Sequence, residues 1–513
     1  MGELGIEVVD CVSDSSTPYY PKSSLISFDQ YSSVQVLPIS DSSPTTTPLD
    51  SNSLPSSSSS SSSPNDEHAQ TQNPMEAWLP LTESRNANIF SAIFQLLCSG
   101  IGFQALLLPL AFASLGWVWG CISLVAAFTW QLYTTWLLVE LHESASGGAR
   151  TSRYLQLAIS AFGTKLGKLL SIFPVMYLSG GTCVMLIITG GRTMQLLFNT
   201  LCGAHCQAKS LSGSEWFLVF TCIAIALALL LPNLNSVSRA SLIGAITAIM
   251  CCTLLWAHSL RKDRPSDITY KPLAAEGQSD VERFGGVFNA LGIIVLAFRG
   301  HNVVLEIQGT LPSNSKKPSR KTMWWAVKIS YIQIAMCLFP LAVAGFWAHG
   351  NKVPSDGSIL TVISQFYGQD TSKSMMILIY VLLIINCLCT FQIYAMVVFD
   401  NLEFTYISSK KQRCSRWLRS VLRIGFGGLA FLIAVAFPFL GSLALLIGGM
   451  TLPLAYAYPC FMWIAIKKPS SKSAMWSVNV GLGCLGLVLS ILLVVAAICN
   501  LADKGLNANF FYP

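Results

Sequence analysis

The stretch FRGHNVVLEIQG, residues 298–309, brings three ionisable side chains into an otherwise apolar part of the sequence. Arg299, His301 and Glu306 follow directly on the apolar run 288–297. An arginine can pair with a carboxylate, a histidine can exchange a proton near neutral pH, and a carboxyl group removed from water can hold a proton. Placing an ionisable group inside an apolar segment of this kind costs free energy, so such a group is by default assigned a function. The stretch therefore predicts a site that handles charged groups or protons.

Each of these side chains also has a structural interpretation. If residues 299–309 formed one helix, Arg299, Asn302 and Glu306 would share a face, and Glu306 could neutralise Arg299 inside the protein. The alternative is that Arg299 contacts the carboxylate of a substrate. His301 is either a proton carrier or a neutral side chain hydrogen-bonded within an interrupted helix, and Glu306 is a second candidate for the proton. The sequence leaves these alternatives open.

The composition of the chain is that of a membrane protein. Of its 513 residues, 52% are hydrophobic and only 11% are charged, and the mean hydropathy is +0.55. A soluble globular protein carries about 25% charged residues. The net charge of +7 is explained by basic loops facing the cytoplasm rather than by nucleic-acid binding. We therefore expect an all-α polytopic membrane protein in a lipid bilayer, with no nucleic-acid partner.

Apolar segments long enough to cross a bilayer recur throughout residues 87–513. A helix needs about 20 residues to cross roughly 30 Å of hydrocarbon. We expect about eleven transmembrane helices, at 89–113, 116–140, 167–197, 215–232, 238–259, 286–311, 323–347, 374–400, 417–438, 440–465 and 476–500. Residues 1–86 are instead rich in Ser and Pro, and they include the serine run 56–63. We expect residues 1–86 to be a disordered cytoplasmic tail and residues 87–513 to be one transmembrane domain.

Lys and Arg residues in the loops favour a cytoplasmic N-terminus. With that orientation, basic residues concentrate in the cytoplasmic loops that follow the predicted second, sixth, eighth and tenth spans. The loop 260–284 argues against this orientation, because it is basic and yet falls outside. The majority of loops still places the N-terminus in the cytoplasm, and eleven spans then place the C-terminus outside the cell.

Two further carboxylates, Glu140 and Asp400, are candidates for proton coupling. They lie near the cytoplasmic ends of the second and eighth predicted spans. That position suits anchoring or gating better than a proton relay.

Two of the predicted spans are interrupted by glycine and polar residues. Glycine lets the backbone leave a helix, and the freed N–H and C=O groups are tolerated at membrane depth only where they line a cavity. Equivalent interruptions in two halves of a chain are typical of an inverted-repeat transporter with its substrate site at the membrane midplane. For any single glycine, close helix packing is the alternative. The predicted substrate-binding residues are Ser99, Gly100, Ile101, Gly102, Ala297, Phe298, Arg299, Gly300 and Asn302.

The ends of the interrupted helices predict what the site binds. A half-helix that begins near Gly102 offers N–H groups and a positive dipole end to a carboxylate. Carbonyl groups near Ala297 and Phe298 can receive an ammonium group. A zwitterionic amino acid fits this pair of fields.

Several segments resemble the plant amino acid/auxin permease family, in its lysine/histidine-transporter-like branch. The resemblance covers about residues 85–505, and its segments are FNALG with AFRGHNVVLEIQGTLPS (288–313), FQIYAMVVFDNLE (391–403), PNLNSVS (232–238), ITGGRTMQ (188–195) and YPCFMWIAIKKP (458–469). It implies a leucine-transporter-like fold of two inverted five-helix repeats plus an eleventh helix, with helices 1 and 6 broken. It also implies proton-coupled uptake of amino acids at the plasma membrane.

Two positions depart from the family pattern. Related proteins have a motif like GAGVLGLPYAM in the first span, whereas GIGFQALLLPLAF (100–112) has more residues between Gly102 and Pro109, among them Gln104. In the sixth span the family usually has a small residue where this chain has Arg299. A guanidinium group there changes the electrostatics of the site. The substrates of the family therefore cannot be assumed to be substrates of this protein.

We therefore expect a secondary active transporter that imports amino acids by alternating access, with protons as the coupling ion. The alternatives are a non-transporting amino-acid sensor with the same fold and a transporter of a related organic acid such as an auxin-like compound. An enzyme is not expected, because HExxH is absent and no Ser/His dyad is apparent.

No metal or other cofactor is expected either. The cysteines are mostly scattered in apolar segments and form no CxxC pair. Cys202 and Cys206 share a polar loop, and whether they form a disulfide is left open.

Overall fold

The described part of the chain is helical. The computed structural model describes residues 78–83, 85–144, 150–202, 211–261, 268–273, 279–298, 300–314, 316–353, 372–437 and 440–504. Within these ranges the only β-structure is one isolated bridge, which confirms the all-α prediction. The α-helices are α1 (Ile89–Gly100), α2 (Leu108–Leu141), α3 (Tyr154–Phe162), α4 (Thr164–Cys202), α5 (Gly213–Leu230), α6 (Leu234–Arg261), α7 (Asp280–Ala297), α8 (His301–Thr310), α9 (Ser319–His349), α11 (Lys373–Lys410), α12 (Arg416–Ala436), α13 (Leu440–Leu452), α14 (Tyr458–Lys467) and α15 (Ala474–Lys504). Two 3₁₀ turns, η2 (Phe103–Leu107) and η5 (Gly350–Lys352), and a π-helical turn, η6 (Pro453–Ala457), join some of them.

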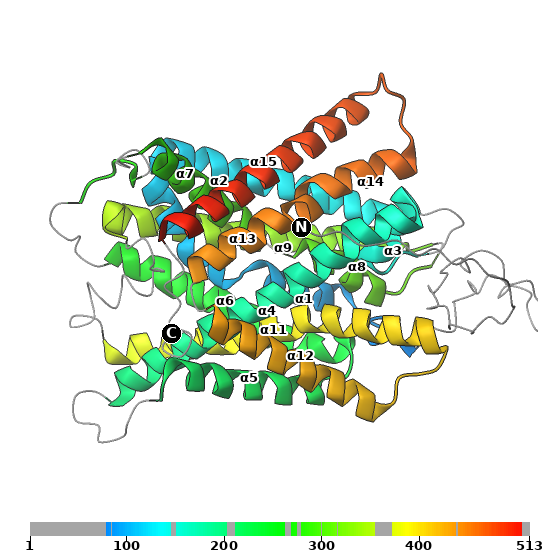
Figure 1. Cartoon of the computed structure of the whole chain (residues 1–513), viewed down its shortest axis with the longest axis horizontal. Coiled ribbons are helices and arrows are strands. Elements are labelled where there is room, and N and C mark those ends of the chain that lie inside the picture. Colours follow the sequence, from blue (N-terminus) through cyan, green and yellow to red (C-terminus); the bar gives the residue numbers. More distant parts are fainter. Residues whose placement is uncertain are drawn as a thin grey trace, which may run out of the picture. The chain divides into compact units, whose positions relative to one another are not determined.

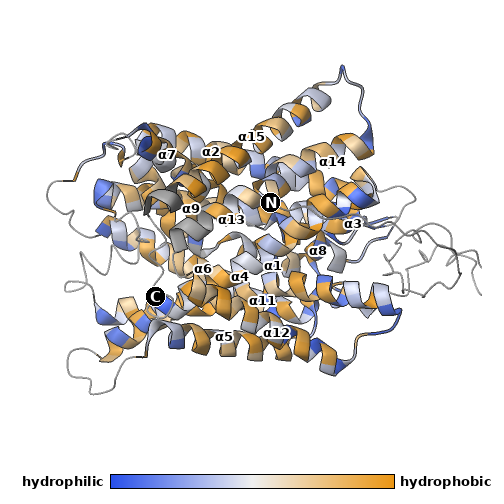
Figure 2. Cartoon of the chain, viewed as in Figure 1, coloured by the Kyte–Doolittle hydropathy of each residue, from blue (hydrophilic) through white to orange (hydrophobic). Residues whose placement is uncertain are grey.

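Among the described residues, nine helices are long and apolar enough to cross a membrane. Figure 2 shows that α5, α12 and α15 are largely hydrophobic. The exposed side chains on these outer helices include Leu230, Trp417 and Leu432, which are 75%, 81% and 63% exposed. Apolar surface of this extent is what lipid covers. The multi-pass membrane prediction is confirmed.

The predicted number of about eleven spans stays a prediction, because two spans are not single helices. The first predicted span is divided between α1 and the residues from Phe103 onward. Gly116 (φ 76°, ψ 178°) leaves the helical conformation and forms a kink inside α2. The part of α2 before this kink belongs to the end of the first predicted span, and the part after it is the second predicted span. The sixth predicted span is divided into α7 and α8.

The short broken helices lie inside, and continuous helices surround them. Every residue of α8 is buried. Helix α1 packs against α6, α8, α9 and α11. Figure 1 shows α5 and α12 side by side, and α15 near α7 and α13, as their contacts confirm. This arrangement keeps the ends of the broken helices away from lipid.

Some helices that follow loops begin with capping residues. Ser279 and Glu282 form a capping box at the start of α7, and Ser212 and Glu215 do so at the start of α5. Asn88 caps α1 by accepting a hydrogen bond of 2.8 Å from the N–H of Ser91. These polar caps fix where the apolar helices begin.

A short segment ahead of α1 packs against the helices. Leu79 and Leu81 are 1% and 2% exposed. The backbone N–H of Ala87 donates to the carbonyl of Thr310 at the end of α8, at 3.2 Å. Most of the predicted tail, residues 1–77 and Ser84, lies outside the described residues. Packed structure thus begins before residue 87, the predicted start of the domain.

Of the two cysteines whose pairing the sequence leaves open, one is described. Cys202, the last residue of α4, is disulfide-bonded. Cys206 lies outside the described residues.

Candidate functional site

The two predicted helix interruptions are present, and they lie against each other. Helix α1 ends at Gly100 and helix α7 ends at Ala297. The next residues, Ile101 (φ −95°, ψ 93°) and Phe298 (φ −96°, ψ 88°), leave the helical conformation. Ile101 and Phe298 form the antiparallel bridge. The prediction of broken helices 1 and 6 is therefore confirmed.

Gly300 is the point at which the sixth span turns into its second half. Its φ of 111° lies in the left-handed region, and it precedes the first residue of α8. Residues with a side chain rarely adopt such a conformation. A Cβ atom at this position would also lie 3.3 Å from Oγ of Ser99. The break thus depends on glycine for its backbone conformation and for the approach of α1. Gly102, in contrast, is extended (φ −108°, ψ 176°).

Two side chains of α11 donate hydrogen bonds to carbonyl groups that have no helical partner because α1 is broken. The hydroxyl of Tyr394 donates to the carbonyl of Ser99 at 3.0 Å. The hydroxyl of Thr390 donates to the carbonyl of Cys98 at 3.1 Å. Buried carbonyl groups require such donors. Helix α11 therefore stabilises the broken end of α1.

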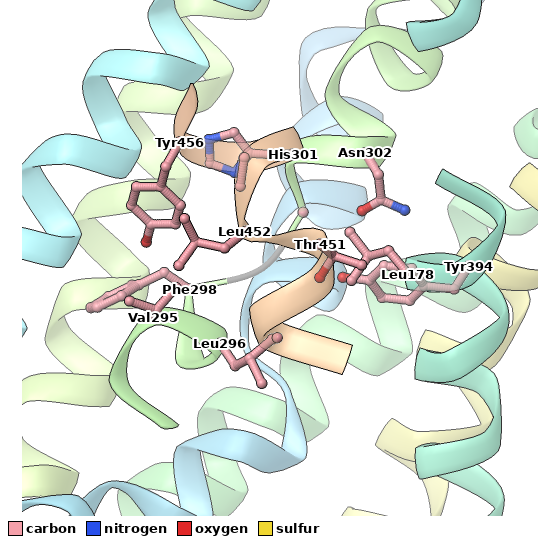
Figure 3. A pocket seen from close by; sticks show the side chains of 13 residues that line it. Leu178, Val295, Leu296, Phe298, His301, Asn302, Tyr394, Thr451, Leu452 and Tyr456 are labelled. Atoms are coloured by element: carbon pink, nitrogen blue, oxygen red, sulfur yellow. The ribbon is translucent and has the colours of Figure 1, made fainter. Parts of the chain in front are cut away.

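A small cavity adjoins the break in the sixth span. Figure 3 shows His301 and Tyr456 on one side of it and Tyr394, Leu178 and Thr451 on the other. The cavity has a volume of about 30 Å³, which is the space of about one water molecule. Pockets for small ligands measure roughly 300–1,000 Å³. The surrounding helices therefore have to move apart before a molecule of amino-acid size can enter. The lining residues are Leu178, Val295, Leu296, Phe298, Gly300, His301, Asn302, Tyr394, Gly448, Thr451, Leu452, Ala455 and Tyr456.

Asn302 presents an acceptor at this cavity. Its Nδ2 donates to Oγ of Ser179 in α4, at 2.8 Å. Its Oδ1 is buried and has no hydrogen-bond partner among the described residues. A buried polar atom without a partner costs about 1–3 kcal/mol. A donor group of a bound molecule would remove that cost.

His301 is held on both ring nitrogens by neutral groups. Nε2 of Gln131 lies 2.9 Å from its Nδ1, and Oε1 of Gln131 accepts the hydroxyl of Tyr456 at 2.8 Å. The amide of Gln131 therefore directs its NH₂ group at His301, which makes Nδ1 an acceptor. The other nitrogen, Nε2, lies 2.9 Å from Oγ1 of Thr134 and 3.1 Å from Oγ1 of Thr135. The network thus fits neutral His301 with its hydrogen on Nε2.

Glu306 lies five residues after His301 in α8 and is 2% exposed. Its Oε1 is 3.5 Å from the backbone nitrogen of Tyr154, and its Oε2 has no hydrogen-bond partner among the described residues. Gly300 has a left-handed φ and α8 begins only at His301, so residues 300–309 are not one continuous helix. Arg299 itself lies outside the described residues.

The other two predicted carboxylates do not line the cavity. Asp400 forms a buried ion pair with Arg153, with 2.6 Å between Oδ2 and Nε. Glu140 forms a more exposed ion pair with Arg320, with 3.0 Å between Oε2 and Nη1. The first pair connects the residue before α3 with α11, and the second connects α2 with α9.

Most polar partners of the site were missed from the sequence. Each is a polar residue inside or next to an apolar span. Many such residues occur in the sequence, so this feature alone does not identify a site residue. The missed residues are Gln131, Thr134, Thr135, Arg153, Tyr154, Ser179, Tyr394, Thr451 and Tyr456. Among the described residues, no group of three His, Cys, Asp or Glu side chains is placed to hold a metal ion.

Comparison with known proteins identifies the family. The model of the family described as "Transmembrane amino acid transporter protein" matches residues 85–499. Lysine histidine transporter-like 7 of Arabidopsis thaliana is 51% identical over 440 residues, covering 86% of this chain and 90% of that protein. Lysine histidine transporter-like 8 of the same plant is 49% identical over 446 residues, covering 87% and 85%.

Solved structures show the same fold at low sequence identity. A Na⁺-coupled sialic acid symporter in a substrate-bound, outward-open state superposes with a TM-score of 0.53 at 12% identity, covering 84% of this chain and 92% of that one. A nucleobase-cation-symport-1 family transporter in a closed conformation gives 0.52 at 12% identity, covering 86% and 97%. The fold is thus that of leucine-transporter-like transporters, and the family is one of transporters rather than enzymes. The chain belongs to the family of transmembrane amino acid transporter proteins.

Proposed function

We propose that the protein is a proton-coupled symporter that imports amino acids across the plasma membrane by alternating access. The observation that carries this proposal is the pairing of Ile101 with Phe298, which brings two helix breaks together inside the bundle. Broken helices expose backbone donors and acceptors in a place that lipid does not reach. The similarity to amino acid transporters supports the substrate, because the family model covers both breaks.

The ends of four helical segments offer hydrogen-bond acceptors for the ammonium group and donors for the carboxylate of a zwitterion. The C-terminal ends of α1 and α7 present carbonyl groups, which suit an ammonium group. The N-terminal ends of η2 and α8 present N–H groups, which suit a carboxylate. The residues that we propose for substrate binding are Ser99, Gly100, Ile101, Gly102, Ala297, Phe298, Gly300 and Asn302, with Arg299 as a further candidate outside the described residues.

Access to the site from the cytoplasm is closed, in this proposal, by the segment ahead of α1. The N-terminus is taken as cytoplasmic and the C-terminus as extracellular. Leu81 donates its N–H to Oδ1 of Asp400 at 3.3 Å, and the hydroxyl of Thr82 lies 3.3 Å from Nη2 of Arg153. Opening this end requires that these contacts separate. Asp400 then acts in gating, which is one of the roles expected for it.

Glu306 is the better candidate for the coupling proton. A charged carboxylate at this buried position leaves Oε2 without a donor among the described residues, which costs several kcal/mol. Binding a proton removes that charge. His301, in contrast, already satisfies both ring nitrogens in its neutral form, and a second proton would face the NH₂ group of Gln131. We therefore assign the proton to Glu306 and a positioning role to His301.

Uptake measurements in a transport-deficient cell test the proposal. The full chain is expressed, and the initial rate of labelled amino acid uptake is measured at two external pH values, with and without a proton ionophore. We expect faster uptake at acidic pH and its loss with the ionophore. Amino acid binding without uptake, at normal surface expression, would indicate a sensor instead. Uptake that ignores both pH and ionophore would refute proton coupling.

A further inference from the structure

The loop that joins α11 to α12 carries a strongly basic, exposed surface. From residue 404 to residue 430 the sequence contains six Lys and Arg residues and no Asp or Glu. Four of these six side chains are exposed, and all four lie between residues 410 and 416. We call these four residues the basic patch: Lys410, Lys411, Arg413 and Arg416.

We infer that the basic patch binds the headgroups of anionic phospholipids in the cytoplasmic leaflet of the membrane, and that bound lipid favours opening of the cytoplasmic end. The inference rests on the proposed function, in which this end of the bundle faces the cytoplasm. Clusters of Lys and Arg directly beside a membrane-spanning helix attract anionic lipids, because the cytoplasmic leaflet has a negative surface potential. The attraction grows with each positive charge near the surface, and the patch supplies four.

Trp417 lies between the basic patch and the apolar part of α12. Its side chain is 81% exposed and directly follows Arg416 in the first turn of the helix. Tryptophan is enriched at the boundary between hydrocarbon and water in membrane proteins. Further along α12, Leu429 and Leu432 are 56% and 63% exposed. Figure 2 shows the loop before α12 as hydrophilic and the helix itself as largely hydrophobic. The patch therefore lies at the depth of the lipid headgroups.

The start of α12 offers further donors to a phosphate group. Its first turn contains Arg416 and no acidic residue, although a positive charge near the N-terminal end of a helix is unfavourable. A phosphate group beside Arg416 would bring negative charge to this helix end. It would also accept hydrogen bonds from the basic side chains and from backbone N–H groups. An anionic headgroup thus supplies the charge that the sequence lacks here.

The same part of the chain holds the segment ahead of α1. Nη2 of Arg413 lies 3.2 Å from Oε1 of Glu83, and the two side chains are 58% and 29% exposed. Nη2 of Arg419 donates to the carbonyl of Trp78 at 2.7 Å. Arg419 is only 14% exposed and forms an ion pair, at 2.9 Å, with buried Glu403. A lipid headgroup can therefore compete with Glu83 for Arg413, whereas the contacts of Arg419 stay in place.

Loss of the contact between Glu83 and Arg413 weakens the closure of the cytoplasmic end. In the proposed mechanism this end opens when the segment ahead of α1 separates from Asp400 and its neighbours. Without the Glu83 contact the segment keeps fewer bonds, among them the hydrogen bond from Leu81 to Asp400 at 3.3 Å. Its separation then requires less free energy, so the cytoplasmic end opens more often. Anionic lipid therefore speeds uptake.

Thermal unfolding of the detergent-purified full chain tests lipid binding. A lipid that binds the folded protein raises its unfolding temperature. Phosphatidylserine should raise this temperature more than phosphatidylcholine does. The triple variant Lys410→Gln, Lys411→Gln and Arg416→Gln should lose this difference, because most of the charge of the patch is removed. Equal shifts with the two lipids, or a difference that the triple variant keeps, would overturn the inference.

Two controls separate the basic patch from other causes. Lys468→Gln with Lys472→Gln removes exposed charges from the loop after α14, and this variant should keep the lipid difference. Loss of the difference in this variant would contradict the assignment to the patch, because basic loops in general would then be responsible. Inorganic phosphate alone should leave the unfolding temperature unchanged. A shift as large as that with phosphatidylserine would identify a soluble anion as the ligand and overturn the choice of a lipid.

Uptake into proteoliposomes tests the consequence for transport. Initial rates are compared between vesicles of phosphatidylcholine alone and vesicles of phosphatidylcholine and phosphatidylserine in equal amounts. Phosphatidylserine should raise the rate about two- to fivefold, which corresponds to the usual strength of one exposed ion pair. Glu83→Gln should show the raised rate already in phosphatidylcholine and should gain little more from phosphatidylserine. The variant with Lys468→Gln and Lys472→Gln should respond like the unaltered protein, because the general surface potential acts on both alike.

The outcomes distinguish the inference from the proposed function. A gain from phosphatidylserine that is as large in Glu83→Gln as in the unaltered protein would overturn the link between the lipid and the segment ahead of α1. Equal uptake by the unaltered protein in both kinds of vesicle would overturn it as well. Uptake in neither kind of vesicle, together with the lipid difference in unfolding temperature, would overturn the proposed function and support the lipid site.

Discussion

Arg153 and Asp400 form an ion pair with almost no contact with solvent. Nε of Arg153 lies 2.6 Å from Oδ2 of Asp400, and the two side chains are 2% and 0% exposed. The pair connects the residue before α3 with the C-terminal third of α11, and Asp400 also accepts the N–H of Leu81. One interaction therefore links the segment ahead of α1 to two parts of the bundle. We therefore expect its removal to affect stability and, in the proposed mechanism, the closing of the cytoplasmic end.

The first prediction is that loss of one partner of this pair is much worse than loss of both. Arg153→Ala or Asp400→Asn should lower stability by about 3–5 kcal/mol, because an unpaired charge stays buried. The apolar double variant Arg153→Met with Asp400→Leu should recover part of this loss. Thermal unfolding of the detergent-purified protein measures each effect. Arg320→Ala is the control, since it breaks the more exposed pair with Glu140 and should cost less than about 1 kcal/mol. Equal losses from the two pairs would contradict the assigned role.

The second prediction concerns the proton. Glu306→Gln keeps the shape of the side chain but cannot bind and release a proton, so uptake should become independent of external pH. His301→Gln should keep a pH response, even if its rate falls. The measurement is the initial uptake rate at two external pH values, normalised to surface expression. A pH response that survives Glu306→Gln and disappears in His301→Gln would reverse our assignment of the two residues.

The positions of the helix breaks could be predicted because their cause is local. Gly100 and Gly300 interrupt apolar runs in the sequence. Helix α1 ends at Gly100, whereas α7 ends at Ala297 and α8 begins directly after Gly300. The boundary between the first two predicted spans also has a local cause, because Gly116 has a non-helical φ of 76° at the kink inside α2.

The partners of the site could not be predicted, because they depend on how the helices are rotated against one another. Gln131 looks like one polar residue in an apolar span, yet it contacts both His301 and Tyr456. Asp400 was expected near the end of its span, but α11 continues to Lys410. Nothing in the sequence pairs Asp400 with Arg153, a basic residue of the loop after the second predicted span. The burial of an arginine from a loop depends on how the chain packs, so the sequence alone does not predict it.

The third prediction tests the left-handed conformation of Gly300. Gly300→Ala should cost about 1–2 kcal/mol from the backbone alone, and its Cβ would press on Oγ of Ser99. Uptake should fall further than surface expression, because the proposed substrate site includes this residue. The matched control is Gly425→Ala in α12, where a Cβ meets no atom within 4 Å and the helix favours alanine. Parallel losses of uptake in the two variants would argue against a special role of Gly300.

The fourth prediction concerns a carboxylate outside the membrane-spanning helices. Glu143 accepts hydrogen bonds from Ser313 and from the backbone and side chain of Ser319, at 2.7, 3.0 and 2.6 Å. Burial alone would raise the pKa of Glu143, but these hydrogen bonds outweigh it and lower the pKa below its ordinary value of 4.5. A lowered pKa in the folded state stabilises the protein above the ordinary pKa, and this contribution disappears as the pH falls through the lowered value.

Glu143→Gln should therefore reduce stability by about 1 kcal/mol at neutral pH, and the difference from the unaltered protein should vanish in strong acid. Thermal unfolding across a pH series measures it. A difference that stays constant down to the lowest pH would show that the charge of Glu143 is not the cause.

The last prediction tests the hydrogen-bond chain from Tyr456 through Gln131 to His301. Tyr456→Phe leaves Oε1 of Gln131 without its donor, and Gln131→Leu leaves both Tyr456 and Nδ1 of His301 without a partner. Each single variant should cost about 1–3 kcal/mol, because a buried polar atom loses its partner. The double variant should cost less than the two losses added together, by about 0.5–3 kcal/mol, because the same bond is removed twice. Tyr270→Phe, which removes a separate bond to the carbonyl of Trp347, should add to Gln131→Leu within about 0.5 kcal/mol. Additive losses from Tyr456→Phe and Gln131→Leu would show that these two side chains act independently and that His301 is positioned by other contacts.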